Sequence, residues 1–271
     1  MTFNIRYGTA DDGPNSWVDR RQLVFRLLAR SKAEVVAVQE ALHFQLQEIC
    51  QALPSYDYVG VGRDDGLRAG EHAALLYRKD QYEVKGSGTF WFSDTPQLPG
   101  STSWGNQITR ICTWAHLYHR KTGISFYAYN VHLDHVSQRS RELSVQLLVR
   151  TILRRNAPDP VVVMGDFNAG PRNQVVGFLL GRKRLLAQNG TAVANCFPLV
   201  DAYAAVHSDT TGVGTYHAFT GDRSGDRIDY VLVQPGIRVK KVVIDHMKSN
   251  ARYPSDHFPV VAQVIVPKAR Q

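Results

Sequence analysis

Two successive rounds of strand-like and helix-like segments constrain the fold of this chain most strongly. In the first round, an alternating segment at residues 2–7 precedes an amphipathic helical segment at 17–30 and a short apolar run at 34–39. In the second round, a long helical segment at 137–154 precedes an apolar run at 160–164. Strands with helices beside them bury their apolar faces in layers. The pattern therefore predicts an α/β protein in which helices cover packed sheets.

The rest of the chain supplies mostly strands, separated by Gly and Pro clusters. The predicted strands lie at 56–61, 72–77, 82–92, 109–118, 124–133, 227–233, 238–246 and 259–266, and short helices at 44–53 and 173–180. No internal repeat, low-complexity tract or Pro/Ser-rich linker divides the sequence. We therefore expect one domain over residues 1–271, with two packed mixed sheets and helices outside them.

Composition limits the partners and the compartment. The formal net charge of +8 fits an anionic substrate, although many basic proteins bind no polyanion. The three cysteines have no metal-ligand spacing and are expected to be reduced. No apolar run approaches the ~18 residues of a membrane span, so we expect no transmembrane segment. We expect a soluble protein, a monomer by default. Cytoplasmic and secreted locations both stay open, because the sequence begins directly in a strand-like segment, as a trimmed chain would.

Polar residues interrupt or end the buried strands, where burial costs free energy unless they are paired or bind something. They come from distant parts of the chain: Asn4, Glu40, Asn130, His132, His135, Asp166, Asn168, Asp229, Asp256 and His257. Taken singly, each has an ordinary structural explanation, such as a turn after a strand or a hydrogen-bonded core amide. Asp229 is the exception, because an aspartate inside an apolar strand needs a partner, for which a histidine is suited.

Together these residues suit a site for a hard divalent cation and a phosphate group. Carboxylate and amide oxygens are the ligands that Mg²⁺ prefers, and Mn²⁺ is an acceptable substitute. Zinc would favour more His and Cys ligands. Polar strand ends from separate segments can meet at one edge of a sheet, where α/β proteins commonly build their sites.

The motifs around these residues resemble those of the endonuclease/exonuclease/phosphatase superfamily of metal-dependent phosphoesterases. In the family's order along residues 2 to 260, they are TFNIR, VVAVQE, NVHLDH, GDFNA, RIDYVLV and SDHFPV. The resemblance implies a four-layer α/β/β/α sandwich, in agreement with the pattern of elements. It also implies in-line attack of water on phosphorus.

The resemblance also implies roles for individual residues. Glu40 resembles the main metal-binding glutamate, and Asp256 the acid that completes the metal environment. Asp166 resembles the aspartate that positions or deprotonates the attacking water, and His257 the histidine at the scissile phosphate, oriented by Asp229. Asn4 resembles the amide beside the metal and the phosphate, and His132 the residue that grips the phosphate or helps the leaving group. Asn168 resembles an amide that donates hydrogen bonds to the phosphate oxygens, and His135 a second phosphate contact. Asn130, at the end of the same strand as His132, is a further candidate substrate contact. Some relatives carry an acidic residue two positions after Asn4, where this chain has Arg6.

Other basic and aromatic residues have two interpretations. Arg110 in the run ITRICTW is a candidate substrate contact, or else forms a salt bridge of little energetic value. Basic groups at 20–21, 139/141, 154–155 and 182–184 are mostly solvated helix faces, or else form a rim that tracks phosphates. The bulky aromatic residues are stacking platforms for bases or headgroups, or else packed loop residues: Trp17, Trp91, Phe92 and Trp104.

Three functions are compatible with these motifs. The first, which the net charge and the arginines favour, is hydrolysis of phosphodiester bonds in DNA, RNA or nucleotides. The alternative is a small-molecule phosphatase, for a sugar or inositol phosphate, or a phospholipid phosphodiesterase with the same site. The third is a binding module without activity, which the presence of all the carboxylates and both site histidines argues against. Steep salt dependence is expected only where several phosphates are contacted, so it distinguishes a polymer substrate from a small one.

Overall fold

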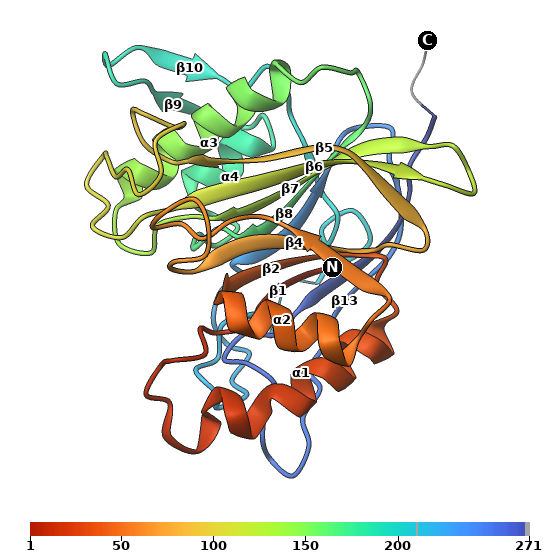
Figure 1. Cartoon of the computed structure of the whole chain (residues 1–271). Helices are drawn as coiled ribbons and strands as arrows, with labels where there is room; N and C mark the ends of the chain where they lie inside the picture. Colours follow the sequence, from red (N-terminus) through yellow and green to blue (C-terminus); the bar gives the residue numbers. More distant parts are fainter. Residues whose placement is uncertain (210, 269–271) are drawn as a thin grey trace.

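The computed structural model describes residues 1–209 and 211–268 and contains two six-stranded sheets that pack face to face (Figure 1). Helices cover the outer face of each sheet, so the predicted four-layer α/β/β/α sandwich is confirmed. The elements are β1 (Thr2–Asn4), a 3-10 turn η1 (Gly13–Asn15), α1 (Trp17–Ser31), β2 (Val35–Ala41), α2 (His43–Ala52), β3 (Tyr56–Val59), β4 (His72–Arg78), β5 (Tyr82–Trp91), β6 (Ile111–His119), β7 (Ser125–His132), α3 (Gln138–Leu153), β8 (Val161–Asp166), α4 (Gln174–Leu179), β9 (Arg184–Leu186), β10 (Ala192–Ala194), β11 (Val200–Asp201), β12 (Asp229–Val233), β13 (Arg238–Ile244) and β14 (Val260–Ile265).

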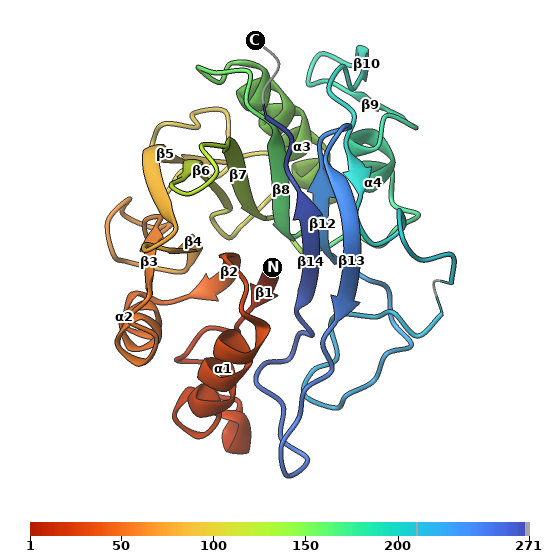
Figure 2. The ribbon, with the colours of Figure 1, turned by 90° about the vertical axis from the view of Figure 1, so that its right-hand side faces the viewer.

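Both large sheets are mixed, as predicted. The first has the order β13-β14-β1-β2-β4-β3 and the second the order β11-β12-β8-β7-β6-β5. Within each sheet one neighbouring pair is parallel, β1 with β2 and β7 with β8, and the other pairs are antiparallel. Figure 2 shows β13 and β14, from the end of the chain, beside the N-terminal strand β1, with which β14 pairs. The first and last thirds of the chain are thereby joined.

Three apolar interfaces hold the four layers together. Leu27 of α1 packs with Val36 and Val38 of β2 on the outside of the first sheet. Because side chains alternate along a strand, Ala37 points to the other face and packs between the sheets. A third cluster joins the second sheet to α3, for example through Leu148. Burial of apolar surface in these interfaces is the main stabilising term of the fold.

The observed elements follow the predicted ones closely, with two differences. The first strand ends at Asn4 and not at residue 7, because Arg6 has a left-handed backbone (φ 56°) that no strand can continue. The short strands β9, β10 and β11 were not predicted. They have two or three residues each and are largely exposed, so they lack a buried alternating face.

The register of the second sheet brings three of the polar strand ends together. Asp166 of β8 lies opposite His132 of parallel β7 and opposite Asp229 of antiparallel β12. Gly165 makes the close approach of β7 and β8 possible, because a Cβ atom there would lie 2.0 Å from the carbonyl oxygen of Val131. The glycine of the GDFN motif is therefore required by packing beside the site.

Two smaller expectations concern the cysteines and the membrane. Cys50, Cys112 and Cys196 form no disulfide, as predicted. Among the described residues, no helix has both the length and the apolar character that crossing a membrane requires.

Candidate active site

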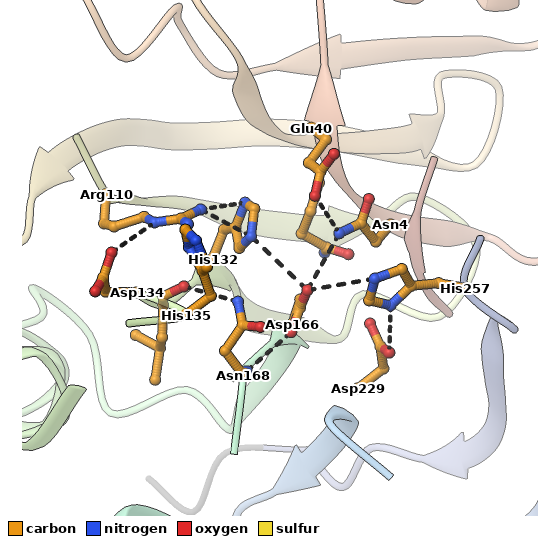
Figure 3. A network of polar contacts seen from close by, with 12 residues as sticks. Asn4, Glu40, Arg110, His132, Asp134, His135, Asp166, Asn168, Asp229 and His257 are labelled. Atoms are coloured by element: carbon orange, nitrogen blue, oxygen red, sulfur yellow. Dashed lines mark hydrogen bonds and ion pairs between the residues drawn. The ribbon is translucent and has the colours of Figure 1, made fainter. Parts of the chain in front are cut away.

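The buried carboxylate of Asp166 lies at the centre of a polar network at the ends of both sheets (Figure 3). Its Oδ2 accepts a hydrogen bond from Asn4 Nδ2 at 3.1 Å, and its Oδ1 accepts one from the backbone N–H of Asn168 at 2.9 Å. The same Oδ2 lies 3.7 Å from His132 Nε2 and 3.9 Å from His257 Nε2. Burial, with the nearby charge of Asp229, raises the pKa of Asp166 to about 7. A carboxyl group in this state can accept a proton near neutral pH.

His257 is paired with Asp229. Its Nδ1 lies 2.9 Å from Asp229 Oδ2, and both side chains are buried. Burial by itself lowers the pKa of His257. The negative charges of Asp229, Asp166 and Asp256 outweigh burial and raise the pKa to about 10, so the ring is an imidazolium at neutral pH.

Glu40 and Asp256 form the acidic side of the site. Glu40 sits at an irregularity in the β2–β4 pairing with a left-handed backbone (φ 61°), and its Oε1 accepts a hydrogen bond from Asn4 Nδ2 at 2.9 Å. The guanidinium group of Arg6 lies 4.0 Å from Glu40 Oε2 and 3.9 Å from Asp256 Oδ2. Arg6 is also paired with Asp12 at 2.9 Å. The positively charged side chain of Arg6 therefore lies beside Glu40 and Asp256, the two carboxylates that the resemblance assigns to the metal.

Arg110 supports the histidines of the site from the interior. It is only 4% exposed, and its Nη2 donates a hydrogen bond to His135 Nδ1 at 2.7 Å. Its Nη1 lies 2.9 Å from His132 Nε2, and its Nε lies 3.4 Å from Asp134 Oδ1. Because Nδ1 of His135 accepts, the neutral ring carries its proton on Nε2. Burial and then the positive charge of Arg110 hold the pKa of His132 well below its usual range.

Asn130 lies away from this centre and connects the two sheets. It is fully buried, and its Nδ2 donates to the carbonyl oxygens of Val38 and Ala74 at 2.8 and 2.7 Å. Its Oδ1 accepts a hydrogen bond from Gln39 at 2.6 Å. The polar atoms of this amide therefore have partners within the protein.

Two acidic residues of the site were missing from the sequence prediction. Asp134 pairs with Arg110, and its Oδ2 accepts the backbone N–H of Ser137 at 2.6 Å just before α3. Glu71 lies 3.9 Å from His132 Nδ1 and pairs with Arg63 at 2.6 Å, and burial raises its pKa to about 7. Asp134 stands inside the NVHLDH motif, which was a usable signal, whereas Glu71 belongs to none of the six motifs.

The predicted basic and aromatic surface features are partly internal. Arg20 is 0% exposed and Arg141 is also buried, so neither belongs to a solvated face or a phosphate-tracking rim. Trp17, Trp91 and Phe92 are buried as well, which makes them packed residues and not stacking platforms.

The donors at the centre fit a hard cation. The polar atoms that could ligate a metal are mostly carboxylate and amide oxygens, the ligands that Mg²⁺ prefers. One of them, Oδ1 of buried Asp229, has no hydrogen-bond partner within the protein. One carboxylate oxygen each of Asp166 and Asp229 and one ring nitrogen of His257 lie within 4.8 Å of one another, which concentrates negative charge around the protonated ring. Several buried carboxyl groups with raised pKa values are the arrangement that a bound cation would stabilise.

Comparison with known proteins agrees with the fold and with the family resemblance of the motifs. The family model "Endonuclease/Exonuclease/phosphatase family" matches residues 1–257. An endonuclease/exonuclease/phosphatase from Bacteroides vulgatus is 36% identical, with a TM-score of 0.87 over 98% of this chain and 97% of that chain. A mannosyl-6-phosphatase of Bacteroides thetaiotaomicron is 30% identical, with a TM-score of 0.83 over 97% of this chain and 98% of that chain.

Curated relatives match over part of their length. Nocturnin of Drosophila melanogaster is 23% identical over 91% of this chain, which covers 41% of Nocturnin. The chain spans about three fifths or less of the length of the curated relatives it matches. The match of the family model over nearly the whole chain nevertheless shows that this protein belongs to the endonuclease/exonuclease/phosphatase family.

Proposed function

We propose that this protein is a divalent-cation-dependent hydrolase that cleaves a small phosphate ester by in-line attack of water. The observation that supports the reaction is the position of Asp166. Its buried carboxylate has a pKa near neutrality and lies within 4 Å of one amide and two imidazoles. A proton acceptor surrounded by hydrogen-bond donors suits a reaction in which water loses a proton while phosphate oxygens gain charge.

Each side chain then has a role in this proposal. Asp166 orients the water and takes its proton. The imidazolium of His257, oriented by Asp229, donates a hydrogen bond from Nε2 to a phosphate oxygen, as does Asn168 through the Nδ2 hydrogen that Leu133 does not accept. We assign Asn4 to the orientation of Asp166 and Glu40, because its Nδ2 donates to both. We assign His132 to the wall of the site beside Asp166, because its Nε2 accepts a hydrogen bond from Arg110. Glu40 and Asp256 would hold the cation, for which Mg²⁺ is proposed and Mn²⁺ is a substitute. When bound, that cation would neutralise charge on the phosphate oxygens and on the leaving oxygen.

Two further candidate substrate contacts receive different roles. We assign Asn130 to the connection between the sheets, because its polar atoms are bonded to Val38, Ala74 and Gln39. We assign Arg110 to positioning, because its guanidinium is buried against His132, His135 and Asp134. His135 is exposed and, through its Nε2–H, stays a candidate substrate contact.

The substrate class rests on two further observations. The 30% identical relative over the whole chain is a mannosyl-6-phosphatase, which favours a sugar phosphate. Arg20 and Arg141 are buried, which removes them from any surface that could track a polymer. The second candidate is a phosphodiester of DNA, RNA or a nucleotide, favoured by the net charge of +8.

An activity screen tests both candidates. The purified protein is assayed with Mg²⁺, with Mn²⁺ and with EDTA on hexose 6-phosphates, inositol phosphates, bis-p-nitrophenyl phosphate, plasmid DNA and RNA, with Asp166→Asn as the control for contaminating activity. We expect cation-dependent release of phosphate from a small ester, with weak salt dependence. Cleavage of DNA or RNA that falls steeply with salt would select the second candidate. Activity that persists in EDTA or in Asp166→Asn would overturn the proposed function.

A further inference from the structure

An exposed aromatic ring that none of the proposed catalytic roles uses lies directly beside the site. The rings of Tyr216 and His257 have centroids 5.2 Å apart and an interplanar angle of 59°. Tyr216 is 51% exposed, whereas His257 is only 5% exposed. Among the described residues, none makes a hydrogen bond with the Tyr216 hydroxyl group. The tyrosine therefore offers solvent both its ring and its polar end, next to the group that we assign to the phosphate.

The backbone holds this ring in place. Tyr216 and His257 form an antiparallel bridge, Phe258 N–H donates to the carbonyl of Thr215 at 2.7 Å, and His217 N–H donates to the carbonyl of Asp256 at 2.8 Å. The two neighbours of Tyr216 in sequence, Thr215 and His217, are buried. Their burial anchors the segment on both sides and leaves Tyr216 as its outward residue. Such a ring loses little conformational entropy when a ligand packs on it.

We infer that Tyr216 is a specificity-determining residue, the surface on which the ring of the substrate's alcohol part packs. The inference rests on the proposed function, because it takes the phosphate to lie beside Asp166 and His257, whose Oδ2 and Nε2 atoms are 3.9 Å apart. The alcohol part then extends from the phosphate towards the ring of Tyr216, whose centroid is 5.2 Å from that of His257. The C–H face of a sugar ring and the planar face of a nucleobase can each pack on an aromatic side chain.

The alternative role for Tyr216 is to hold the His257 ring in its orientation. That role would change turnover on every phosphate ester alike, whereas a stacking surface acts only on substrates that carry a ring. The KM values for esters with and without a ring therefore separate the two roles.

The experiment compares hexose 6-phosphate, a nucleoside 5′-monophosphate and glycerol 3-phosphate as substrates of the wild type, Tyr216→Ala and Tyr216→Phe. We expect Tyr216→Ala to raise KM at least fivefold on a ring-bearing ester, the lower end for base stacking on an aromatic side chain. The ratio of kcat/KM between that ester and glycerol 3-phosphate falls by the same factor, and Tyr216→Phe keeps the ratio. A larger fall in kcat/KM on hexose 6-phosphate indicates that a sugar packs on Tyr216, and a larger fall on the nucleoside 5′-monophosphate indicates a nucleoside.

Tyr118→Ala is the matched control, because Tyr118 is a partly exposed tyrosine at the opposite end of β6 from Arg110. It should leave the ratio unchanged. If the wild type cleaves only diesters, thymidine 5′-p-nitrophenyl phosphate serves as the ring-bearing ester and glycerophosphocholine as the ester without a ring. The same fall in the ratio of their kcat/KM values is then expected for Tyr216→Ala.

The outcomes are distinct. An equal fall of kcat on all esters, or no change in the ratio, overturns the inference while the proposed function stands. A wild type that is inactive on every phosphate ester, with either cation, overturns the proposed function and the inference with it.

Discussion

His257 Nδ1 and Asp229 Oδ2 lie 2.9 Å apart in a pair from which solvent is almost completely excluded. Thr215 holds the aspartate in place, because its Oγ1 accepts the backbone N–H of Asp229 at 3.2 Å. The pair is charge-assisted, and the charge of Asp229 is the first of the effects that raise the pKa of His257. Its function is therefore testable through the titration of the histidine.

Asp229→Asn should lower kcat about 100-fold or more without loss of the fold, because the amide keeps the shape of the side chain but not its charge. In the wild type, the raised pKa keeps His257 protonated up to about pH 10. In the variant the pKa falls towards its ordinary value near 6.5. The alkaline side of the kcat/KM profile should therefore move to lower pH, which assays from pH 5 to 10 would detect. An unchanged profile would show that the protonated state of His257 has no part in the reaction.

Asp166→Asn tests the proton acceptor itself. The amide can still accept hydrogen bonds through its oxygen, but it cannot take a proton from water near neutral pH. We expect kcat to fall by a factor of 100 to 10,000, roughly the contribution of a positioned general base. Circular dichroism and thermal unfolding serve as controls for the fold. Near-normal turnover by the purified variant would remove Asp166 from the mechanism.

The part of the site that lies at strand ends could be predicted from the sequence. His132, Asp166 and Asp229 each interrupt or end an apolar run, and the β7–β8 and β8–β12 registers bring them together. The pattern is informative because a buried strand rarely ends in an ionisable residue without a reason. Packed mixed sheets with helices outside them were predictable on another ground, because the helical and strand periods were distinct. The family resemblance implied the four-layer arrangement.

Contacts made by loops could not be predicted in this way. Glu71 reaches His132 from the start of β4, and no periodic pattern marks it. The burial of Arg20 depends on a segment that approaches from the other end of the chain, where the carbonyl of Pro254 accepts its hydrogen bond. A helical pattern shows which residues share a face, but not what covers that face.

Arg20 and Arg21 are adjacent arginines of α1 with opposite environments, so they make a matched pair. Arg20 donates to the carbonyls of Ile5, Arg6, Asn15 and Pro254 at 2.6 to 2.9 Å, and these connect α1 to the segments after Asn4 and before Asp256. Arg21 is partly exposed and pairs with Glu48 at 3.0 Å. Arg20→Met leaves buried carbonyls without donors and should lower the free energy of unfolding by about 3 kcal/mol.

Arg21→Met should cost less than about 1 kcal/mol, as is usual for an exposed ion pair. Urea denaturation of both variants measures the difference. Similar losses for the two substitutions would contradict the structural role of Arg20.

His217 should make stability depend on pH. Its Nδ1 accepts a hydrogen bond from the backbone N–H of Gly221 at 3.2 Å, and its ring stacks on Phe258 with centroids 3.9 Å apart. Burial, with the positive charge of His257, lowers the pKa of His217 to about 4. Because the folded pKa lies below the unfolded value near 6.5, the unfolded state binds the proton more readily. The contribution of His217 to the free energy of unfolding is therefore fully present above pH 6.5 and is lost as the pH falls towards 4.

The comparison with His217→Gln isolates this contribution from those of the other histidines. Urea denaturation at pH 7.5, 6 and 5 should show that the free energy of unfolding of the wild type falls more than that of the variant. The difference arises because protonated Nδ1 can no longer accept the Gly221 N–H, whereas glutamine does not titrate. Parallel pH profiles for the two proteins would mean that His217 does not titrate below its ordinary pKa.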